Sequence, residues 1–462
     1  MSFHFKKLGL AILVTSSFSG CSAIVKTPYN APTVQVPQQF QYDAQKNQNV
    51  NLTDQWWTLF NDAQLNQLVD QVLAKNSDLI VAGITLKQAR LQAGLAENRQ
   101  GLRTSSSVST GYSYDLRSGD GSDRGLSTSL GVSYELDLFG KLANQTEASR
   151  WEAQASEQDL QATAQSLVGT TAKLYWQLGY LNERYQTVQQ NLASTQKIYA
   201  LVQSQYKAGA VSGLDLTQAE QSVQSQKASL SQIEQQRVEA RTAIAVLLHQ
   251  PVQQLNIQEP AQLPRNALPN IGVGLPAEIL SRRPDLQASE LRLRKTLANK
   301  DATKASYYPS INLTSSVGAS STSLTQLLQN PALALGASLS LPFLQYNDMK
   351  KDIAISDLEY EKAITQYRQG LYQAFADVEN ALSNRTQLDQ QVQLQQRNVE
   401  LAEKTEHLTE VRYRNGAIAL KNVLDAQATT RNARLNLVET KQNQYNAYVT
   451  LMQALGGSPI KQ

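Results

Sequence analysis

Few side chains in this sequence are of the types that do catalytic or metal-binding chemistry. The 462 residues include one cysteine, Cys21, and three histidines. His249 and His407 lie far apart along the chain, so neither a Cys/His metal site nor a Cys–His nucleophile pair is expected. Gly272-Val-Gly274 is followed at once by Leu-Pro, which is not the strand-to-helix setting of a dinucleotide loop. The sequence therefore predicts a protein that is not an enzyme and holds no metal.

The surroundings of Cys21 favour a different chemistry, namely lipid attachment. Lys6 and Lys7 precede a short apolar run over residues 8–14, the order of an export signal. Small residues then lead into the cysteine, as in a bacterial lipobox, although Phe18 stands where leucine is usual. This resemblance to a lipobox implies that Cys21 carries an N-terminal diacylglycerol and acyl chain.

This lipid would fix both the mature N-terminus and the location of the protein. Residues 1–20 form the predicted lipoprotein signal peptide, and residues 21–55 form an acylated, extended N-terminal segment. Several acyl chains, at about 0.8 kcal/mol per buried CH₂ group, make an effectively permanent anchor. Ser22 follows the cysteine where aspartate would alter sorting, so we expect lipid anchoring in the cell outer membrane.

Composition excludes other classes of partner. The formal net charge is only +3, and charged residues make up 18% of the chain. The sequence has no basic stripe interleaved with aromatic residues, so nucleic acid is not an expected partner. Gln, Ala, Ser and Leu recur through most of the chain, which favours long helices with solvent-exposed faces over a compact apolar core.

The sequence is duplicated at an offset of 207 residues. Tyr206-Lys-Ala-Gly-Ala-Val returns as Tyr413-Arg-Asn-Gly-Ala-Ile, and Asn76-Ser-Asp-Leu returns as Arg283-Pro-Asp-Leu. Units of this length exclude a solenoid or a propeller. We predict a first repeat over residues 56–250, a proline-marked linker over 251–270, and a second repeat over 271–457.

Each repeat contains two segments of about ten residues that alternate apolar with small polar residues, the pattern of a membrane barrel. The clearest apolar positions are Leu126, Leu130, Val132, Tyr134, Leu136 and Leu138 in the first repeat, and Leu333, Leu335, Leu339 and Leu341 in the second. A soluble sandwich alternates in the same way. Serine and glycine suit a lumen, however, and no other sheet is predicted for the strands to pack on.

Four strands cannot close a barrel, and an open sheet edge in lipid leaves unpaired backbone groups that cost several kcal/mol each. Single-chain barrels need about eight strands or more. The chain must therefore pool its strands with copies of itself, and a trimer would supply twelve.

Long helices make up the larger part of each repeat. Residues 141–207 contain no proline and keep a heptad pattern of apolar or small residues from Leu160 to Tyr206. Such a helix reaches about 100 Å at 1.5 Å per residue. Residues 347–414 repeat the pattern more loosely. Gly209 and Gly416 follow the two helices where a left-handed conformation is favoured, and a second helix then returns in each repeat. Shorter helices, expected over residues 62–100 and 276–305, lead into each pair of strands.

This order of elements resembles the TolC/OprM-type outer-membrane efflux channels, in the lipoprotein branch found with RND pumps. Short words support the resemblance: Trp56-Trp57-Thr-Leu-Phe60, Tyr134-Glu-Leu-Asp-Leu-Phe-Gly-Lys141, Arg282-Arg-Pro-Asp-Leu286 and Tyr308-Pro-Ser310. The family implies a membrane α+β fold: a homotrimeric, 12-stranded β-barrel continued by a long periplasmic α-helical barrel. Implied partners are a periplasmic adaptor (membrane fusion) protein, an inner-membrane RND-type pump and outer-membrane lipids.

The resemblance also implies a gate at the periplasmic tip, where Gly209 and Gly416 form the turns. Asp425 matches an acidic ring, Tyr413 matches a constricting tyrosine, and Asp215 matches the partner of that tyrosine. A three-fold ring of carboxylates narrows a pore and favours cations.

Two positions depart from some family members. Asn422 replaces a second acid and Ile418 replaces an arginine. These departures predict a single charge ring and a weaker latch, unless Arg412 or Arg414 substitutes for that arginine. The simpler reading of Asp425 is a surface pair with Lys421, four residues earlier. Asp215 is equally well read as an acid that favours the first turn of its helix.

The resemblance implies an exit duct that passively conducts drugs and amphiphiles delivered by a pump. Two alternatives stay open: a channel of the same fold for protein secretion or metal export, and a non-conducting coiled-coil lipoprotein. A wet conduit lined by Gln and Ser exerts little selectivity, so the sequence does not identify the substrates.

Overall fold

The protein is described from a computed structural model. It describes residues 26–42, 54–113, 123–265, 268–269, 281–321, 327, 329, 331–457 and 459. The chain divides into two compact units. Unit 1 comprises Met1–Val34, Ile84–Gln158 and Ala288–Gly370; unit 2 comprises Gln35–Gly83, Asp159–Gln287 and Leu371–Gln462.

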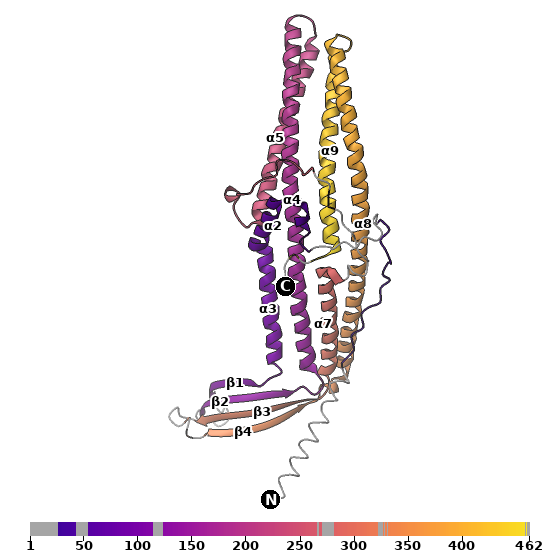
Figure 1. Ribbon diagram of the computed structural model, residues 1–462. Coiled ribbons are helices and arrows are strands. Elements are labelled where there is room, and N and C mark those ends of the chain that lie inside the picture. The colour runs from indigo at the N-terminus through magenta and orange to yellow at the C-terminus, as the bar shows by residue number, and fades with distance from the viewer. Residues whose placement is uncertain are drawn as a thin grey trace. The chain divides into compact units, whose positions relative to one another are not determined.

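Unit 1 contains a four-stranded antiparallel sheet in the order β1-β2-β3-β4 (Figure 1). Its strands are β1 (Arg103–Ser113), β2 (Asp123–Leu136), β3 (Ser310–Ser321) and β4 (Pro331–Ser340). The register places Leu130 opposite Val317, and Val317 opposite Leu333. Directly opposed residues share a face, so the apolar side chains gather on one face and the serines and glycines on the other. The predicted alternation is confirmed.

The small-polar face of the sheet is closely packed. Serine hydroxyls of β1 and β2 bond to each other, with oxygens 2.8 Å apart for Ser107 and Ser129 and 2.7 Å apart for Ser109 and Ser127. A Cβ atom on Gly318 would lie 2.8 Å from the carbonyl oxygen of Thr128. The centre of this face therefore has room only for side chains as small as those of glycine and serine.

The apolar face and the outer strands of the sheet have no cover within the described chain. Val108 on β1 and Leu335 on β4 are 75% and 77% exposed. Among the described residues, β1 pairs only with β2 and β4 pairs only with β3. The outer edges of β1 and β4 and the apolar face of the sheet are thus left without a partner within the described residues.

Helices follow the strands in unit 1. The helix α4 (Lys141–Lys207) starts after Gly140, whose φ is +78°. The Asp137 carboxylate accepts from the backbone N–H groups of Leu142 and Ala143 at 3.1 and 2.7 Å, so this aspartate caps the helix. In the second repeat, the 3₁₀ turn η5 (Pro342–Leu344) leads into α8 (Tyr346–Arg414). The two predicted long helices are confirmed.

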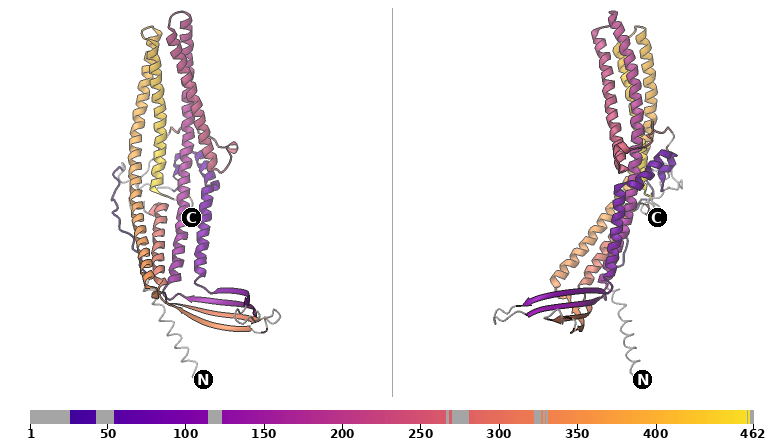
Figure 2. Two further views of the ribbon diagram at one scale, coloured as in Figure 1. Left: turned by 180° about the vertical axis from the view of Figure 1, so that it is seen from behind. Right: turned by 90° about the vertical axis from the view of Figure 1, so that its left-hand side faces the viewer.

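In unit 2 the long helices turn back to form two hairpins. The helix α5 (Gly213–Leu247) pairs with α4, and α9 (Leu420–Leu455) pairs with α8 (Figures 1 and 2). Over the described ranges, no helix has an apolar stretch long enough to cross a membrane.

The heptad pattern of α4 describes its buried side. Ala164, Leu178 and Val202 are fully buried, as the pattern predicts, whereas Tyr206 at its end is exposed. Between residues 164 and 181 further residues are also buried, including Trp176. The helix is enclosed more completely there because it passes through the main core of unit 2.

That core contains a group of packed aromatic rings. The Phe60 ring centre lies 4.6 Å from that of Trp176 and 5.0 Å from that of Tyr448, and Trp176 lies 4.9 Å from Tyr445. Trp56 packs edge-on to Phe60 at 6.4 Å. The word Trp56-Trp57-Thr-Leu-Phe60 forms the short η2 helix (Trp56–Phe60), and it supplies three of the rings in or beside this core.

The helix predicted over residues 62–100 is interrupted. It consists of α2 (Ala63–Lys75) and α3 (Ser77–Asn98), separated by Asn76 in an extended conformation. The Asn76 side chain accepts from the N–H of Asp78 at 2.9 Å and donates to the carbonyl of Leu247 at 3.0 Å. The side chain thus starts a new helix and ties it to the end of α5.

The second repeat has its equivalent helix α7 (Pro284–Ser306). Its first residue, Pro284, corresponds in the duplicated motif to Ser77, the first residue of α3. Proline is well suited to the first turn of a helix. The first residues of the helix predicted over 276–305 lie outside the described residues.

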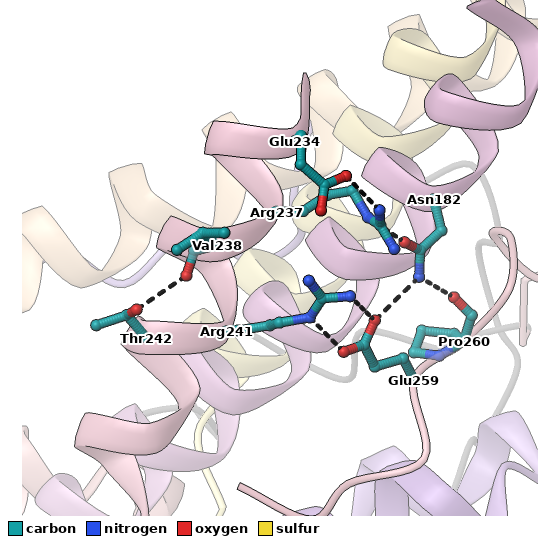
Figure 3. A network of polar contacts seen from close by, with 8 residues as sticks. All are labelled: Asn182, Glu234, Arg237, Val238, Arg241, Thr242, Glu259 and Pro260. Carbon is teal, nitrogen blue, oxygen red and sulfur yellow. Dashed lines mark hydrogen bonds and ion pairs between the residues drawn. The ribbon is translucent and has the colours of Figure 1, made fainter. Parts of the chain in front are cut away.

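The described part of the linker after α5 is bonded to side chains of α4 and α5. Glu259 forms a bidentate ion pair with Arg241, at 2.5 and 3.0 Å, and Asn182 donates to the carbonyl of Pro260 at 2.9 Å (Figure 3). Arg237 donates to the Asn182 side chain at 2.8 Å. The α4–α5 hairpin therefore holds the linker at this point.

Candidate functional site

Both hairpins of unit 2 close through the same backbone turn. Gly209 and Gly416 have φ values of +73° and +70°, in the left-handed region that glycine adopts at little cost. The residue after each glycine donates to the carbonyl five residues earlier: Ala210 to Gln205 at 2.8 Å and Ala417 to Arg412 at 2.9 Å. This is a Schellman motif, and it confirms that the long helices end at these glycines.

The two return helices begin differently. At the start of α5 the Ser212 hydroxyl accepts from the Asp215 N–H at 3.3 Å, and the Asp215 carboxylate accepts from the Ser212 N–H at 3.0 Å. This reciprocal pair is a capping box. At the start of α9 the corresponding residue is Ala419, whose side chain makes no cap. The first return helix is therefore capped and the second is not.

Tyr413 joins the two hairpins near their turns. Its hydroxyl donates to the side-chain oxygen Oε1 of Gln205, 2.9 Å away. The expected direct bond from Tyr413 to Asp215 is absent between these two described residues, and the Asp215 oxygen Oδ2 instead accepts from Ser212. The sequence reasoning missed Gln205, whereas the Ser-x-x-Asp spacing at Ser212 was a visible capping signal.

Electrostatics nevertheless couple Tyr413 to Asp215. Partial burial and the negative charge of Asp215 raise the pKa of Tyr413 above its usual value, so its hydroxyl stays protonated as a donor. Hydrogen bonds from the Ser212 side chain and backbone lower the pKa of Asp215. The carboxylate is therefore charged near neutral pH and belongs to the cap.

A small apolar cluster lies next to this tyrosine. Its buried members come from all three of α4, α5 and α9: Ile198, Val202, Ala219, Leu420 and Val423. Tyr413 of α8 packs against the cluster. Leu420 is the first residue of α9, so the start of the uncapped helix is held mainly by apolar contact.

The acidic and basic candidates near the second turn form pairs within their own helices. Lys421 bonds Asp425 at 2.6 Å, and Arg414 bonds Glu410 at 2.5 Å. Asp425 thus forms the surface ion pair with Lys421 that their four-residue spacing predicts. Arg412 contributes its backbone carbonyl to the turn. A ring of Asp425 carboxylates needs other copies of the chain, so its gating role stays a prediction.

Cys21 lies outside the described residues. No cluster of three or more His, Cys, Asp or Glu side chains that could hold a metal occurs among the residues that are described.

Comparison with known proteins identifies the architecture. A sequence model described as "Outer membrane efflux protein" matches residues 68–249 and 275–457. The chain belongs to this outer membrane efflux protein family. It is 28% identical to Toxin and drug export protein A of Aggregatibacter actinomycetemcomitans over 457 residues, or 98% of each protein.

Two further relatives of this efflux-family chain are informative. It is 31% identical to the pyoverdine export outer membrane protein OpmQ of Pseudomonas putida over 88% of each protein. Its fold matches the solved outer-membrane channel OprN with a TM-score of 0.85 at 26% identity, covering 94% of this chain and 99% of OprN.

These findings confirm the family and the fold class predicted from the sequence. The members of the family are channels of the outer membrane, and the function of this efflux protein is that of an outer-membrane exit duct.

Proposed function

We propose that this protein is the outer-membrane exit duct of a tripartite efflux pump and works as a homotrimer. It would passively conduct drugs and amphiphiles delivered by an inner-membrane RND-type transporter through a periplasmic adaptor. The observation that carries the proposal is the sheet, which has one apolar face, one serine and glycine face, and two unpaired edges within the described chain.

The sheet supports a trimer through hydrogen bonding. An unpaired strand edge in lipid is excluded by the cost of its bare N–H and C=O groups. Pairing β4 of one protomer with β1 of the next satisfies both edges at once, and three copies bring twelve strands, more than the roughly eight that a closed barrel needs. The apolar faces then meet lipid, and the serine faces line water.

The hairpins support a gated periplasmic end. The Tyr413–Gln205 bond joins the last turn of α8 to the last turn of α4 within one protomer. Three symmetric copies of this bond would hold the ends of the helices close together. The Asp425 carboxylates would line the same constriction and favour cations. The lipid on Cys21 would hold the trimer in the outer membrane.

Two observations on relatives guide the substrate test. One relative is named for toxin and drug export and another for pyoverdine export, so the proteins similar to this chain are named for different cargoes. Here the cargo is proposed to be chosen by the pump, since the described part of the serine and glycine face presents mainly small polar side chains.

Drug susceptibility tests the proposal directly. A strain lacking this chain would be compared with its parent on a panel of unrelated antibiotics, dyes, detergents and metals. Sensitisation to many amphiphilic compounds, reversed by the wild-type chain, is the expected result. Sensitisation to a single metal, or loss of a secreted protein without any drug phenotype, would overturn the proposed drug-type duct.

A further inference from the structure

Unit 1 contains a cavity that the duct does not use. It has a volume of about 670 Å³, within the roughly 300–1,000 Å³ typical of small-ligand sites. One wall is the N-terminal strap, which we define as residues 26–29. The other walls come from the residues between α7 and β3, from η5 and from the first turns of α8.

The strap is fixed to the helices of unit 1. Asp301 on α7 is only 2% exposed, and its two oxygens accept from the N–H and the hydroxyl of Thr27, both at 2.7 Å. Lys26 pairs with Glu147 on α4 at 2.7 Å. A buried carboxylate must be satisfied by hydrogen bonds, so Thr27 has a defined position at this site.

Tyr29 provides a second fastening for the strap. Its hydroxyl donates to Glu290 at 3.2 Å, and the Arg294 guanidinium lies over its ring, 4.5 Å from the ring centre. Both partners belong to α7. The strap therefore leaves Lys26 at a fixed point beside the cavity.

The interior of the cavity is suited to an apolar chain. Its lining includes Tyr307, Tyr308, Phe343, Met349 and Ile353. Two lysines border the apolar lining. Lys26 is paired with Glu147, and Lys304 lies 3.5 Å from Asp357, which also pairs with Lys300 at 2.9 Å. Each lining lysine thus has an acidic partner, and the Asp357 carboxylate is shared by two lysines.

The cavity lies at one end of the sheet. Ser310 and Ser340 are opposed there, at the start of β3 and the end of β4, and Pro309 lines the cavity directly before that start. Tyr308 stacks on Phe139 at 4.7 Å beside it. Aromatic residues at strand ends are typical of the level where a membrane meets water.

Cys21 is only five residues before Lys26. A chain of that length spans at most about 18 Å when fully extended, so any group on Cys21 stays near the cavity. We propose that this cavity holds one acyl chain of the lipid carried by Cys21. The proposal rests on the lipid anchor in the proposed function, and the strap serves to bring that lipid to the rim of the sheet.

Photo-crosslinking in the full-length, membrane-bound protein tests the occupant. A benzophenone amino acid would replace Phe343, which lines the cavity, and in a matched control it would replace Leu344, which is next in sequence and 73% exposed. After irradiation and proteolysis, mass spectrometry identifies what each probe has captured. We expect the probe at position 343 to capture the lipidated Cys21 peptide at least fivefold more often than the probe at position 344.

Other captures overturn the proposal. A probe at position 343 that yields only free phospholipid, only a peptide of a neighbouring subunit, or the same products as position 344 would show that the cavity has a different occupant. The mass of the N-terminal peptide separates two kinds of failure. A Cys21 peptide that carries no lipid would contradict the lipid anchor of the proposed function. A lipidated Cys21 peptide that is not crosslinked to position 343 would contradict only the proposal that the cavity holds its acyl chain.

A second variant tests the strap. Thr27→Val keeps the shape of the side chain but removes the hydroxyl group that donates a hydrogen bond to Asp301. We expect it to lower the crosslink yield at position 343 severalfold while Cys21 stays lipidated. An unchanged yield would contradict the positioning role of Thr27.

Discussion

The Tyr413 hydroxyl donates a hydrogen bond to Oε1 of Gln205, 2.9 Å away, and so connects the last turn of α8 to the last turn of α4. The tyrosine at the equivalent place in the first repeat, Tyr206, is 47% exposed. The duplication has therefore given one tyrosine a joining role that its counterpart lacks.

Tyr413→Phe is expected to loosen the two hairpins. Removing one such hydrogen bond costs about 0.5–1.5 kcal/mol, and a trimer loses it three times. We expect a larger single-channel conductance in planar bilayers for this variant than for the wild type. Tyr206→Phe is the matched control and should leave conductance unchanged. Equal conductance for Tyr413→Phe and the wild type would argue against the joining role.

The capping box makes a prediction about local stability. Ser212→Ala should cost about 1 kcal/mol and speed amide hydrogen exchange in the first turn of α5. The reverse change, Ala419→Ser with Asn422→Asp, should supply a box to α9 and slow exchange there. Ser229→Ala, in the middle of α5, controls for loss of a hydroxyl. If Ser212→Ala left exchange at the start of α5 unaltered, the cap would not be stabilising.

The same cap should depend on pH. The pKa of Asp215 is lower in the folded protein than in the unfolded chain because Ser212 donates to its charged form. Its stabilisation is thus complete above the unfolded value of about 3.9 and is lost as the pH falls through the folded value. Relative to the intrinsic exchange rate at each pH, the protection of the amides at the start of α5 should fall below pH ~4, and less so in Ser212→Ala.

Asp425 tests the acidic ring. Within one protomer, the side chains of Asp425 and Lys421 are both exposed to solvent. Their ion pair therefore stabilises the fold by only about 0.3–0.5 kcal/mol. Asp425→Ala should therefore leave folding intact, raise conductance and reduce cation preference in planar bilayers. Lys421→Ala breaks the same pair without removing the carboxylate and should keep cation preference. Unchanged ion selectivity in Asp425→Ala would refute the ring.

Glu259 is expected to hold the linker. Its bidentate pair with Arg241 is partly buried, and the Arg241 guanidinium lowers the pKa of Glu259 despite that burial. Glu259→Gln should lose about 1–2 kcal/mol of local stability and make residues 251–265 more sensitive to limited proteolysis. Glu400→Gln, at an exposed pair with Arg397 on α8, is the matched control. Equal cleavage rates in the two variants would contradict this role.

Much of the fold could be predicted because its periods are short and regular. Alternation of period two places Leu130, Val317 and Leu333 on one face whatever lies beyond the sheet, and the observed register agrees. Glycine at 209 and 416 marks helix ends because few other residues adopt a left-handed conformation cheaply. These are local properties, and local sequence is sufficient to determine them.

The missed features depend on contacts between distant segments. The break at Asn76 follows partly from a bond to Leu247, which sequence spacing does not reveal. Tyr413 bonds Gln205 on the other hairpin, whereas the Asp215 carboxylate accepts from Ser212 at the start of its own helix. The capping motif was visible in the sequence, but the contact between Tyr413 and Gln205 becomes apparent only when both hairpins are seen together.

The central claim is that three copies of this chain form a gated duct. Single-channel recording of the purified, full-length protein in planar bilayers tests it most directly, with the copy number of the same sample measured by native mass spectrometry. We predict particles of three copies, small cation-selective steps for the wild type and larger steps for Tyr413→Phe. Folded trimers that stay silent in both forms, or a protein that remains monomeric in its membrane-extracted state, would contradict the account.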